Sequence, residues 1–252
     1  MRQVRRNRTK EKLAAGKTVV GTWLNLASPV AAEHLAHVGF DFLVVDAEHS
    51  PIGLNSVFQC LQGIAGGEAT PMARVAWNDP MVIKQVFEAG AWGVVVPMVN
   101  SADEAVQAVR AMRFPPDGAR SMGALASAYG PDYGARANAE ILAVVMVEHI
   151  DAIGRAADIV TVPGVDVVFI GTGDLALSMG VPIGHPEHEA AVQAVLRAGQ
   201  AAGTPVGLPC RSAEDVNTRA AQGFRFIDLS SDFRMLMAAA TEALGKIVKS
   251  DE

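Results

Sequence analysis

Eight short apolar runs recur along the chain, and a segment with helical periodicity follows each of them. The runs are rich in Val, Ile and Leu and lack polar alternation, which is typical of parallel strands that are buried on both faces. The predicted strands are Val19–Leu26, Phe42–Asp46, Pro71–Val75, Val94–Val99, Val144–Val147, Val167–Ile170, Pro205–Leu208 and Phe226–Leu229. Eight such units in 252 residues predict an α/β protein, a single (β/α)8 TIM barrel domain covering residues 1–252.

The predicted helices begin after capping residues such as Ser28, Asp79 and Ser101 and often end at Gly. They are Pro29–Val38, Leu54–Ile64, Pro80–Ala89, Ala102–Met112, Ile150–Val160, Pro186–Ala202, Ala213–Ala221 and Phe233–Val248. The rhythm breaks once, at Arg113–Glu140, which is rich in Gly, Pro and Ala. We expect this segment at the end of the barrel opposite the carboxyl ends of the strands, unless it folds back or reaches a neighbouring subunit.

The composition, half hydrophobic and 19% charged, predicts a compact globule. Residues 1–17 carry a net charge of +6 within a chain of −6, and we expect a short basic helix exposed to solvent there. Motifs for reading nucleic acid are missing, and no apolar run approaches the roughly 18 residues of a membrane span. No secretory signal begins the sequence, and its two cysteines, Cys60 and Cys210, suit a reduced compartment. We therefore predict a cytoplasmic protein with neither nucleic-acid nor membrane partners.

Carboxylates follow two of the predicted strands. Glu148 comes directly after Val144–Val147, and Asp174 lies four residues after Val167–Ile170. Ligands of parallel barrels bind at this end of the strands, and two convergent carboxylates suit a hard cation such as Mg²⁺ or Mn²⁺. The alternative is that Glu148 and Asp174 merely cap the helices that begin near Asp151 and at Leu175.

A histidine and an arginine follow neighbouring strands. Asp46 lies three residues before His49 and could fix the tautomer of its imidazole, while the planar fork of Arg74 suits a carboxylate or an enolate oxygen. A structural role for His49, and a salt bridge from Arg74 to Asp46 or Glu48, are the alternatives. Trp23 either forms a wall of the pocket or packs in the core.

The run Gly171-Thr172-Gly173 lets backbone N–H groups approach an anion at the start of the next helix. Nucleotide cofactors are not expected, because the chain has neither a Walker motif nor G-x-G-x-x-G. His149 either joins the site or faces outward, opposite to Glu148. The remaining histidines are predicted to be surface or helix residues: His34, His37, His185 and His188.

Five motifs occur in one order: VDAEHSP at 45–51, RVAWNDP at 74–80, VPMV at 96–99, FPPDGAR at 114–120 and FIGTGDL at 169–175. Together they resemble the HpcH/HpaI aldolase family, class II pyruvate aldolases such as 4-hydroxy-2-oxoheptanedioate aldolase. The resemblance covers residues 18–235 or so. It implies a homo-oligomer, usually a hexamer, in which the last helix is exchanged between subunits.

The resemblance also implies a reaction: reversible cleavage of a 4-hydroxy-2-oxo acid into pyruvate, or a related 2-oxo acid such as hydroxypyruvate, and an aldehyde through a metal-bound enolate. Glu148 and Asp174 would hold the Mg²⁺, Mn²⁺ or Co²⁺ ion. His49 would act as the base with Asp46 behind it, and Arg74 would stabilise the enolate. The predicted substrate-binding residues are Trp23, Arg74, Gly173 and Asp174.

Three departures from the family pattern are expected to affect substrate choice more than reaction type. Met146 stands where relatives often have Gln, Gly171-Thr172-Gly173-Asp174 replaces Gly-Pro-Ala-Asp, and residues 121–133 differ. Schiff-base chemistry is not expected, because no predicted strand ends in lysine and Lys84 lies in a helix. A CoA-thioester lyase of the citrate lyase or malyl-CoA lyase type, and a non-catalytic metal-stabilised scaffold, are the alternative functions.

Overall fold

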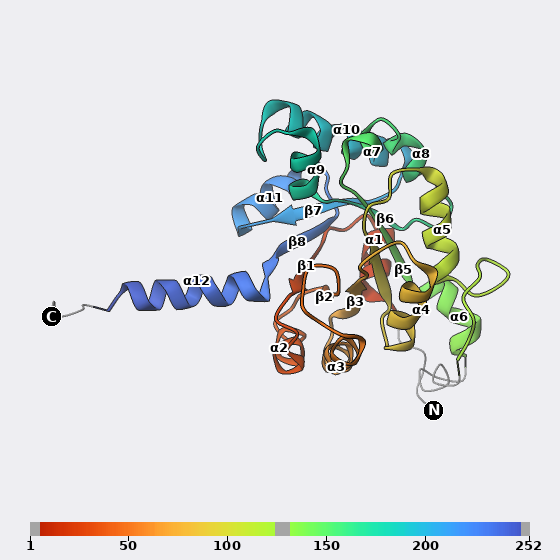
Figure 1. Ribbon diagram of the computed structural model, residues 1–252, viewed down its shortest axis with the longest axis horizontal. Helices are drawn as coiled ribbons and strands as arrows, with labels where there is room; N and C mark the ends of the chain where they lie inside the picture. The colour runs from red at the N-terminus through yellow and green to blue at the C-terminus, as the bar shows by residue number, and fades with distance from the viewer. Residues whose placement is uncertain (1–5, 124–131, 248–252) are drawn as a thin grey trace.

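The computed structural model describes residues 6–123 and 132–247, and its strands form a closed parallel barrel in the order of the sequence (Figure 1). The predicted (β/α)8 barrel is thus confirmed. Its last strand closes the barrel by pairing with the first, with Phe226 opposite Val19. The strands are β1 (Val19–Leu24), β2 (Phe42–Asp46), β3 (Thr70–Arg74), β4 (Gly93–Val96), β5 (Leu142–Val147), β6 (Val167–Ile170), β7 (Val206–Cys210) and β8 (Phe226–Ser231).

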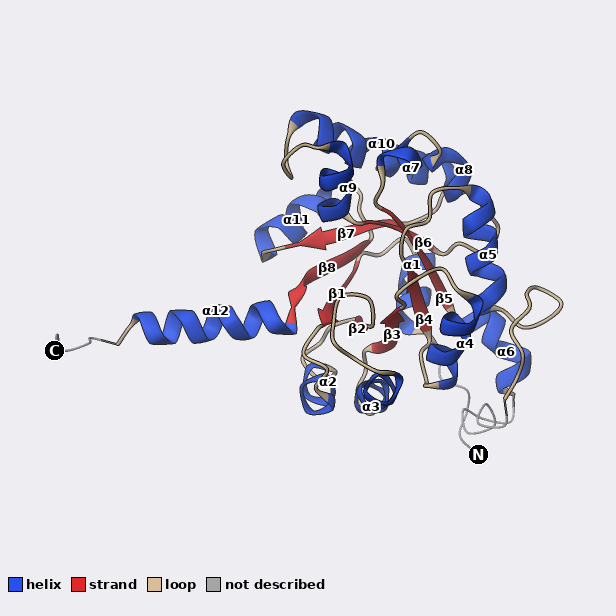
Figure 2. Ribbon diagram, viewed as in Figure 1, coloured by secondary structure: helices blue, strands red, loops and turns tan. Residues whose placement is uncertain are grey.

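Most of the helices surround the barrel on its outer face, while the last one extends away from it (Figure 2). They are α1 (Arg8–Ala14), α2 (Pro29–Leu35), α3 (Leu54–Ala65), α4 (Pro80–Glu88), α5 (Ala102–Met112), α6 (Tyr133–Glu140), α7 (Ile150–Ile153), α8 (Ala156–Val160), α9 (Thr172–Met179), α10 (Pro186–Ala202), α11 (Ala213–Gln222) and α12 (Asp232–Gly245). Among the helices of the described part, none has the length and apolar character needed to cross a membrane.

Two apolar layers hold the barrel together, because successive side chains of a strand point to opposite faces. The outer layer packs the strands against the helices, and the inner layer fills the barrel. Inside, the rings of Phe42 and Phe226 stack at 4.0 Å, and Phe169 meets Phe226 edge to face at 6.0 Å. Gly21 leaves room for this stack, since a Cβ there would lie 2.3 Å from the Phe42 ring. Each such buried ring stabilises the fold by roughly 1.5–3 kcal/mol.

Helix α1 closes the amino-terminal end of the barrel. Leu13 packs into the inner layer, and Lys10 pairs with Asp166 at 3.0 Å while Lys12 pairs with Asp41. In the described part of the predicted basic segment the helix is present, and Arg8 and Lys12 are exposed to solvent as expected, while Thr9 and Leu13 on its other face are buried. Lys10 and Lys12 thus neutralise acidic residues at the amino-terminal end of the barrel.

Several predicted boundaries differ from the structure, each for a local reason. Strand β4 ends at Val96 because Pro97 has no amide hydrogen to donate to a neighbouring strand. The single helix predicted over Ile150–Val160 is broken at Gly154 into α7 and α8. Helix α6 lies in the segment Arg113–Glu140, for which no helix was predicted and whose residues 124–131 are outside the described ranges.

Helix α12 leaves the barrel and extends away from it, as Figure 1 shows. Its large apolar side chains are exposed along most of its length, and the short segment that follows adds one more. They are Phe233, Leu236, Met237, Leu244 and Ile247. Within this single chain, the apolar face of α12 has little to pack against.

Candidate active site

The functional side chains converge at the carboxyl ends of the strands because of the two-residue repeat of each strand. Val19, Phe42 and Val144 point into the barrel, and every second residue after each of them does the same. This repeat places Trp23 on β1 and Asp46 on β2 at inward positions, and Glu148 at the next inward position after the end of β5. Residues predicted from four separate segments are in this way brought to one end of the barrel.

Arg74 and Asp46 form a bidentate ion pair between β3 and β2. The guanidinium Nε donates to Oδ1 at 2.9 Å and Nη2 donates to Oδ2 at 2.7 Å. Burial works to raise the pKa of Asp46, but the hydrogen bonds and the charge of Arg74 outweigh it and hold that pKa below its usual value. Asn25 adds a further hydrogen bond to Asp46 at 2.7 Å, so both partners are firmly oriented.

The carboxylate nearest the His49 ring is Glu48, not Asp46. Glu48 Oε2 lies 3.7 Å from His49 Nε2 and 3.0 Å from Arg74 Nη1. Asp46 accepts from the backbone N–H groups of Glu48 at 3.1 Å and of His49 at 3.3 Å, and its oxygens also accept from Arg74 and Asn25. The expected contact between Asp46 and the imidazole is therefore corrected: Asp46 positions the His49 backbone, and the half-exposed ring is left to face the site.

Glu148 is buried, with 2% of its surface exposed, and its Oε1 accepts from the backbone N–H of Met98 at 2.7 Å. Met98 adopts a positive φ of 54°, which aims that N–H at the carboxylate. Burial, together with the negative charges of Glu48 and Asp174, raises the pKa of Glu148 to about 7. The positive charge around Glu148 is therefore too small to offset its burial and its acidic neighbours.

Asp174 is exposed in the first turn of α9, which begins at Thr172 rather than at Leu175 as predicted. A cavity of about 400 Å³, the carboxylate cavity, is lined by Glu48, Glu148 and Asp174. Within residues 6–123 and 132–247, no three His, Cys, Asp or Glu side chains form a complete metal site. Two carboxylates nevertheless fit a small divalent ion, which keeps water or substrate as its remaining ligands.

Gly171 leaves Glu148 the space that its carboxylate occupies. A Cβ at position 171 would lie 2.2 Å from Glu148 Oε2, whereas the open position of Gly173 has no atom within 4 Å. The predicted glycine run therefore has two different roles. Gly171 accommodates the carboxylate, and Gly173 keeps the backbone at the start of α9 accessible.

A second cavity of about 250 Å³, the central cavity, lies beside the first, and His49 and Asp174 line both. Arg74 of β3 and Met146 of β5 also line it. Trp23 forms part of its wall, stacked on Phe169 at 5.1 Å and lying 5.9 Å from the Arg74 guanidinium. Both alternatives for Trp23 are therefore realised, since it is buried and still lines the cavity.

Two histidines differ in part from expectation. The ring of His149 lines the carboxylate cavity, where its Nδ1 accepts from the Asp151 backbone N–H at 3.3 Å. His188 lies on a helix as predicted but is buried, and its ring accepts from Gly184 at 3.4 Å and contacts the Thr172 carbonyl oxygen at 2.9 Å. It fastens α10 to the start of α9.

Sequence reasoning missed several residues of the central cavity, above all Asp228 and Arg234. Asp228 is 6% exposed and points into the barrel from β8, two residues after Phe226. A signal was present, because an acid at an inward position of an apolar strand is rarely tolerated without a role.

The family model for HpcH/HpaI aldolase/citrate lyase matches residues 19–239. The chain is 39% identical over 245 residues to a 4-hydroxy-2-oxo-heptane-1,7-dioate aldolase of Shigella sonnei, with 94% of this chain and 93% of the relative covered. It is 38% identical to a 2-dehydro-3,6-dideoxy-6-sulfogluconate aldolase of Pseudomonas putida, with 89% and 91% covered.

Among solved structures, an HpcH/HpaI aldolase/citrate lyase family protein from Burkholderia cenocepacia superposes with a TM-score of 0.91 at 36% identity. The match covers 95% of this chain and 98% of that one. The family match spans all eight strands of the barrel, from the start of β1 into α12. On sequence and architecture together, the chain belongs to the HpcH/HpaI aldolase/citrate lyase family.

Proposed function

We propose that this protein is a divalent-metal-dependent aldolase that reversibly cleaves a 4-hydroxy-2-oxo acid into pyruvate, or a related 2-oxo acid such as hydroxypyruvate, and an aldehyde. The observation that carries the proposal is the arrangement of charge around the two adjoining cavities. An arginine fixed in a bidentate pair reaches one of them, and a buried carboxylate with a raised pKa lines the other. A site that binds a 2-oxo acid and stabilises its enolate needs both kinds of group.

Glu148 and Asp174 would hold an ion such as Mg²⁺, Mn²⁺ or Co²⁺, whose Lewis acidity polarises a 2-oxo group when it is bound. The fit is supported by the uncompensated charge around Glu148 and by the space that Gly171 leaves for it. The names of the relatives support the reaction class, since both are aldolases.

Arg74 binds the substrate oxygen on which negative charge develops as the C3–C4 bond breaks, and its pair with Asp46 fixes the direction of the guanidinium. The backbone at Gly173, in the first turn of α9, orients the substrate carboxylate. Trp23 and Phe169 form an apolar wall that limits water around the pyruvate methyl group.

His49 moves the proton. In the cleavage direction it takes the proton of the C4 hydroxyl group, and it then returns a proton to C3 of the enolate, which gives pyruvate. Its half-exposed ring lines both cavities, and Glu48 is placed to stabilise the imidazolium that forms.

We also propose that the enzyme is a cytoplasmic homo-oligomer, a hexamer, in which α12 packs against a neighbouring subunit. The exposed apolar side chains of α12 support the exchange of this helix. Burial raises the pKa of the Cys60 and Cys210 thiols to about 11 and about 12, which suits permanently reduced cysteines.

The test is exchange of the pyruvate methyl protons in D₂O, followed by proton NMR, because it needs no knowledge of the aldehyde. We expect exchange with Mn²⁺ or Mg²⁺ and none with EDTA. The isosteric Glu148→Gln variant should lose it, while Glu187→Gln, at an exposed position on α10, should not. Absence of exchange with every divalent ion, in a folded protein, would refute a pyruvate aldolase.

A further inference from the structure

The turn that follows β1, residues 25–28, is held by the first residue of α12. The Asp232 carboxylate accepts from the backbone N–H of Asn25 at 2.7 Å through Oδ1 and from that of Leu26 at 3.2 Å through Oδ2. Asp232 is buried, with 6% of its surface exposed. The two oxygens of one buried carboxylate therefore fix two successive backbone amides of the turn.

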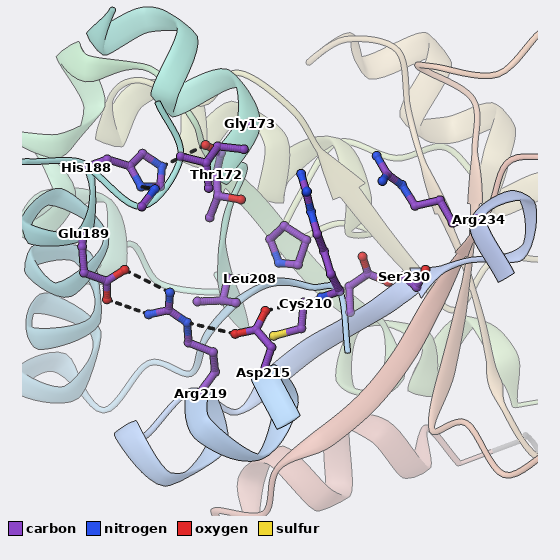
Figure 3. Close-up of a pocket in the computed structure, with 15 residues that line it drawn as sticks. Thr172, Gly173, His188, Glu189, Leu208, Cys210, Asp215, Arg219, Ser230 and Arg234 are labelled. Carbon is purple, nitrogen blue, oxygen red and sulfur yellow. Dashed lines mark hydrogen bonds and ion pairs between the residues drawn. The ribbon is translucent and has the colours of Figure 1, made fainter. Parts of the chain in front are cut away.

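The closure of the barrel brings Asp232 to this turn. Strand β8 ends at Ser231 and α12 begins at the next residue, without an intervening loop. Figure 3 labels Ser230 and Arg234, which flank this junction in the chain, beside a cavity of about 400 Å³. Because Trp23 pairs with Ser231 where β8 meets β1, the residue after Ser231 lies next to the turn that begins two residues after Trp23.

Ala27, in the same turn, adopts a φ of 54°, which is rare for a residue other than glycine. Such a conformation persists where the surrounding structure imposes it. Ser28 supplies the other support of the turn, because its side chain caps α2 by accepting from the Ala31 backbone N–H at 3.2 Å. The backbone from which the Asn25 side chain projects is thus fixed on both sides.

The side-chain amide of Asn25 uses both of its hydrogens. Its Nδ2 donates to Asp46 Oδ2 at 2.7 Å and to Ser50 Oγ at 3.2 Å. The pKa of Asp46 is held below its usual value by Arg74, so Asp46 is ionised and can only accept. The amide nitrogen of Asn25, and not its oxygen, therefore has to face Asp46.

The two acceptors of this amide support the two groups to which the proposed reaction gives a charge-stabilising and a proton-transferring role. Asp46 holds the Arg74 guanidinium in the bidentate pair, and Ser50 directly follows His49 in the loop after β2. Asn25, Asp46, His49 and Arg74 all line the central cavity. One amide therefore connects the support of the arginine with the loop that carries the histidine.

We propose that Asn25 and Asp232 are positioning residues of the aldolase. Asp232 holds the turn after β1, and Asn25, through the two acceptors of its amide, holds Arg74 and His49 in the arrangement that the reaction needs. The inference rests on the proposed function for the roles of Arg74 and His49. Since those roles concern charge and proton transfer in the transition state, loss of the positioning residues should lower kcat more than it raises KM.

The first measurement is the kinetics of methyl-proton exchange of pyruvate in two variants of Asn25. Asn25→Asp keeps the shape of the side chain but replaces the N–H donor by an acceptor that repels Asp46, and Asn25→Leu removes both polar atoms. Each should lower kcat at least about 10-fold and change KM by less than about 2-fold, because a small misplacement of a catalytic group costs rate rather than binding.

Asn138 of α6 provides the matched control. Its Nδ2 also donates to a carboxylate, Asp117 Oδ2 at 2.9 Å, and to a second oxygen, that of the Phe114 carbonyl group at 2.9 Å. It lines neither the carboxylate cavity nor the central cavity. Asn138→Asp and Asn138→Leu should leave kcat and KM unchanged. Equal losses of kcat in the two sets of variants, or a higher KM without loss of kcat in the Asn25 set, overturns the proposal.

A double-mutant cycle tests whether Asp232 acts through Asn25. Asp232→Asn leaves one oxygen for the turn and should lower kcat about 3-fold or more, but it should have little further effect in the Asn25→Leu background, because the amide to be positioned is already lost. Effects that add fully in the double variant, or a fall in the molar mass measured by light scattering, would show that Asp232 acts on α12 instead and would overturn its role.

A second measurement does not depend on turnover. In protein labelled with ¹⁵N-arginine, the Nε–H signal that disappears in Arg74→Lys belongs to Arg74. Its exchange with water should become at least about 10-fold faster in Asn25→Leu and remain unchanged in Asn138→Leu, because the pair with Asp46 opens more often.

The two measurements separate this inference from the proposed function. A folded protein that does not exchange pyruvate protons would refute the aldolase, and the Arg74 signal would still report whether Asn25 positions the arginine. Normal pyruvate exchange in the Asn25 variants, with an unchanged Arg74 signal, would leave the aldolase standing and overturn the positioning role.

Discussion

The Arg74 guanidinium and the Asp46 carboxylate face each other through two parallel hydrogen bonds, at 2.9 and 2.7 Å, from directly paired positions on β3 and β2. Arg74 is 8% exposed and Asp46 is fully buried. Strand pairing thus fixes the direction of a charged group that lines the central cavity.

Replacement of Asp46 by Asn should damage both stability and activity. Loss of one partner leaves a buried guanidinium poorly neutralised, and we expect the free energy of unfolding to fall by about 3 kcal/mol. Pyruvate exchange should fall by at least about 100-fold, because Arg74 is no longer held in direction. Urea unfolding and NMR measure the two effects. Glu189→Gln, in a partly exposed pair with Arg219, should change stability by less than about 1 kcal/mol.

The free energy of unfolding should depend on pH because the buried Glu148 carboxylate titrates at a different pH in the folded and unfolded states. The pKa of Glu148 is about 7 in the fold against an ordinary value of 4.5, so the folded state binds the proton more tightly. The free energy of unfolding should therefore fall by up to about 3 kcal/mol as the pH rises from 4.5 to 7 in EDTA. Urea titrations at pH 5 and pH 8 test this.

Two controls accompany that experiment. Glu148→Gln should remove most of the fall, leaving the part due to Glu48, whose pKa is also raised by burial. Mg²⁺ should stabilise the protein more at pH 8 than at pH 5, because a metal ligand must be deprotonated. Equal stabilisation by Mg²⁺ at the two pH values would contradict a metal role for Glu148.

Gly171→Ala should weaken metal binding. The added methyl group would lie 2.2 Å from Glu148 Oε2 and displace the carboxylate, so we expect the Mn²⁺ dissociation constant to rise at least about 10-fold. Gly173→Ala, two residues away with open space around it, is the matched control and should leave Mn²⁺ affinity unchanged. Calorimetric titration with Mn²⁺ compares the two variants.

Helix α12 should determine the oligomer. Charged substitutions at Leu236 and Met237, which are exposed in the single chain, should reduce the molar mass measured by light scattering. Glu242→Lys, on the same helix, is the control and should leave the molar mass unchanged, because it replaces one charged side chain by another and adds no charge to the apolar face. An unchanged mass for Leu236→Glu/Met237→Glu would argue against packing of α12 on a neighbour.

Much of the site was open to prediction because strand ends and side-chain alternation are local properties. Glu148, Asp174 and Arg74 were expected at the carboxyl ends of strands, and the barrel places all three there. The partner of Asp46 was not predictable in the same way. Asp46 lies three positions from His49 and 28 positions from Arg74, yet its side chain forms the bidentate pair with the distant residue.

The sequence by itself determined the eight-unit barrel and the strand ends that carry charge, because hydrophobic periodicity and capping act over a few residues. Only the tertiary structure decided which charges meet. Closure of β8 onto β1 brings Asp228 and Ser230 to the same cavity as Arg74, 154 and 156 residues away in the chain. Which residue of β8 pairs with which residue of β1 depends on the packing of the whole inner layer, so it cannot be predicted from a local sequence pattern.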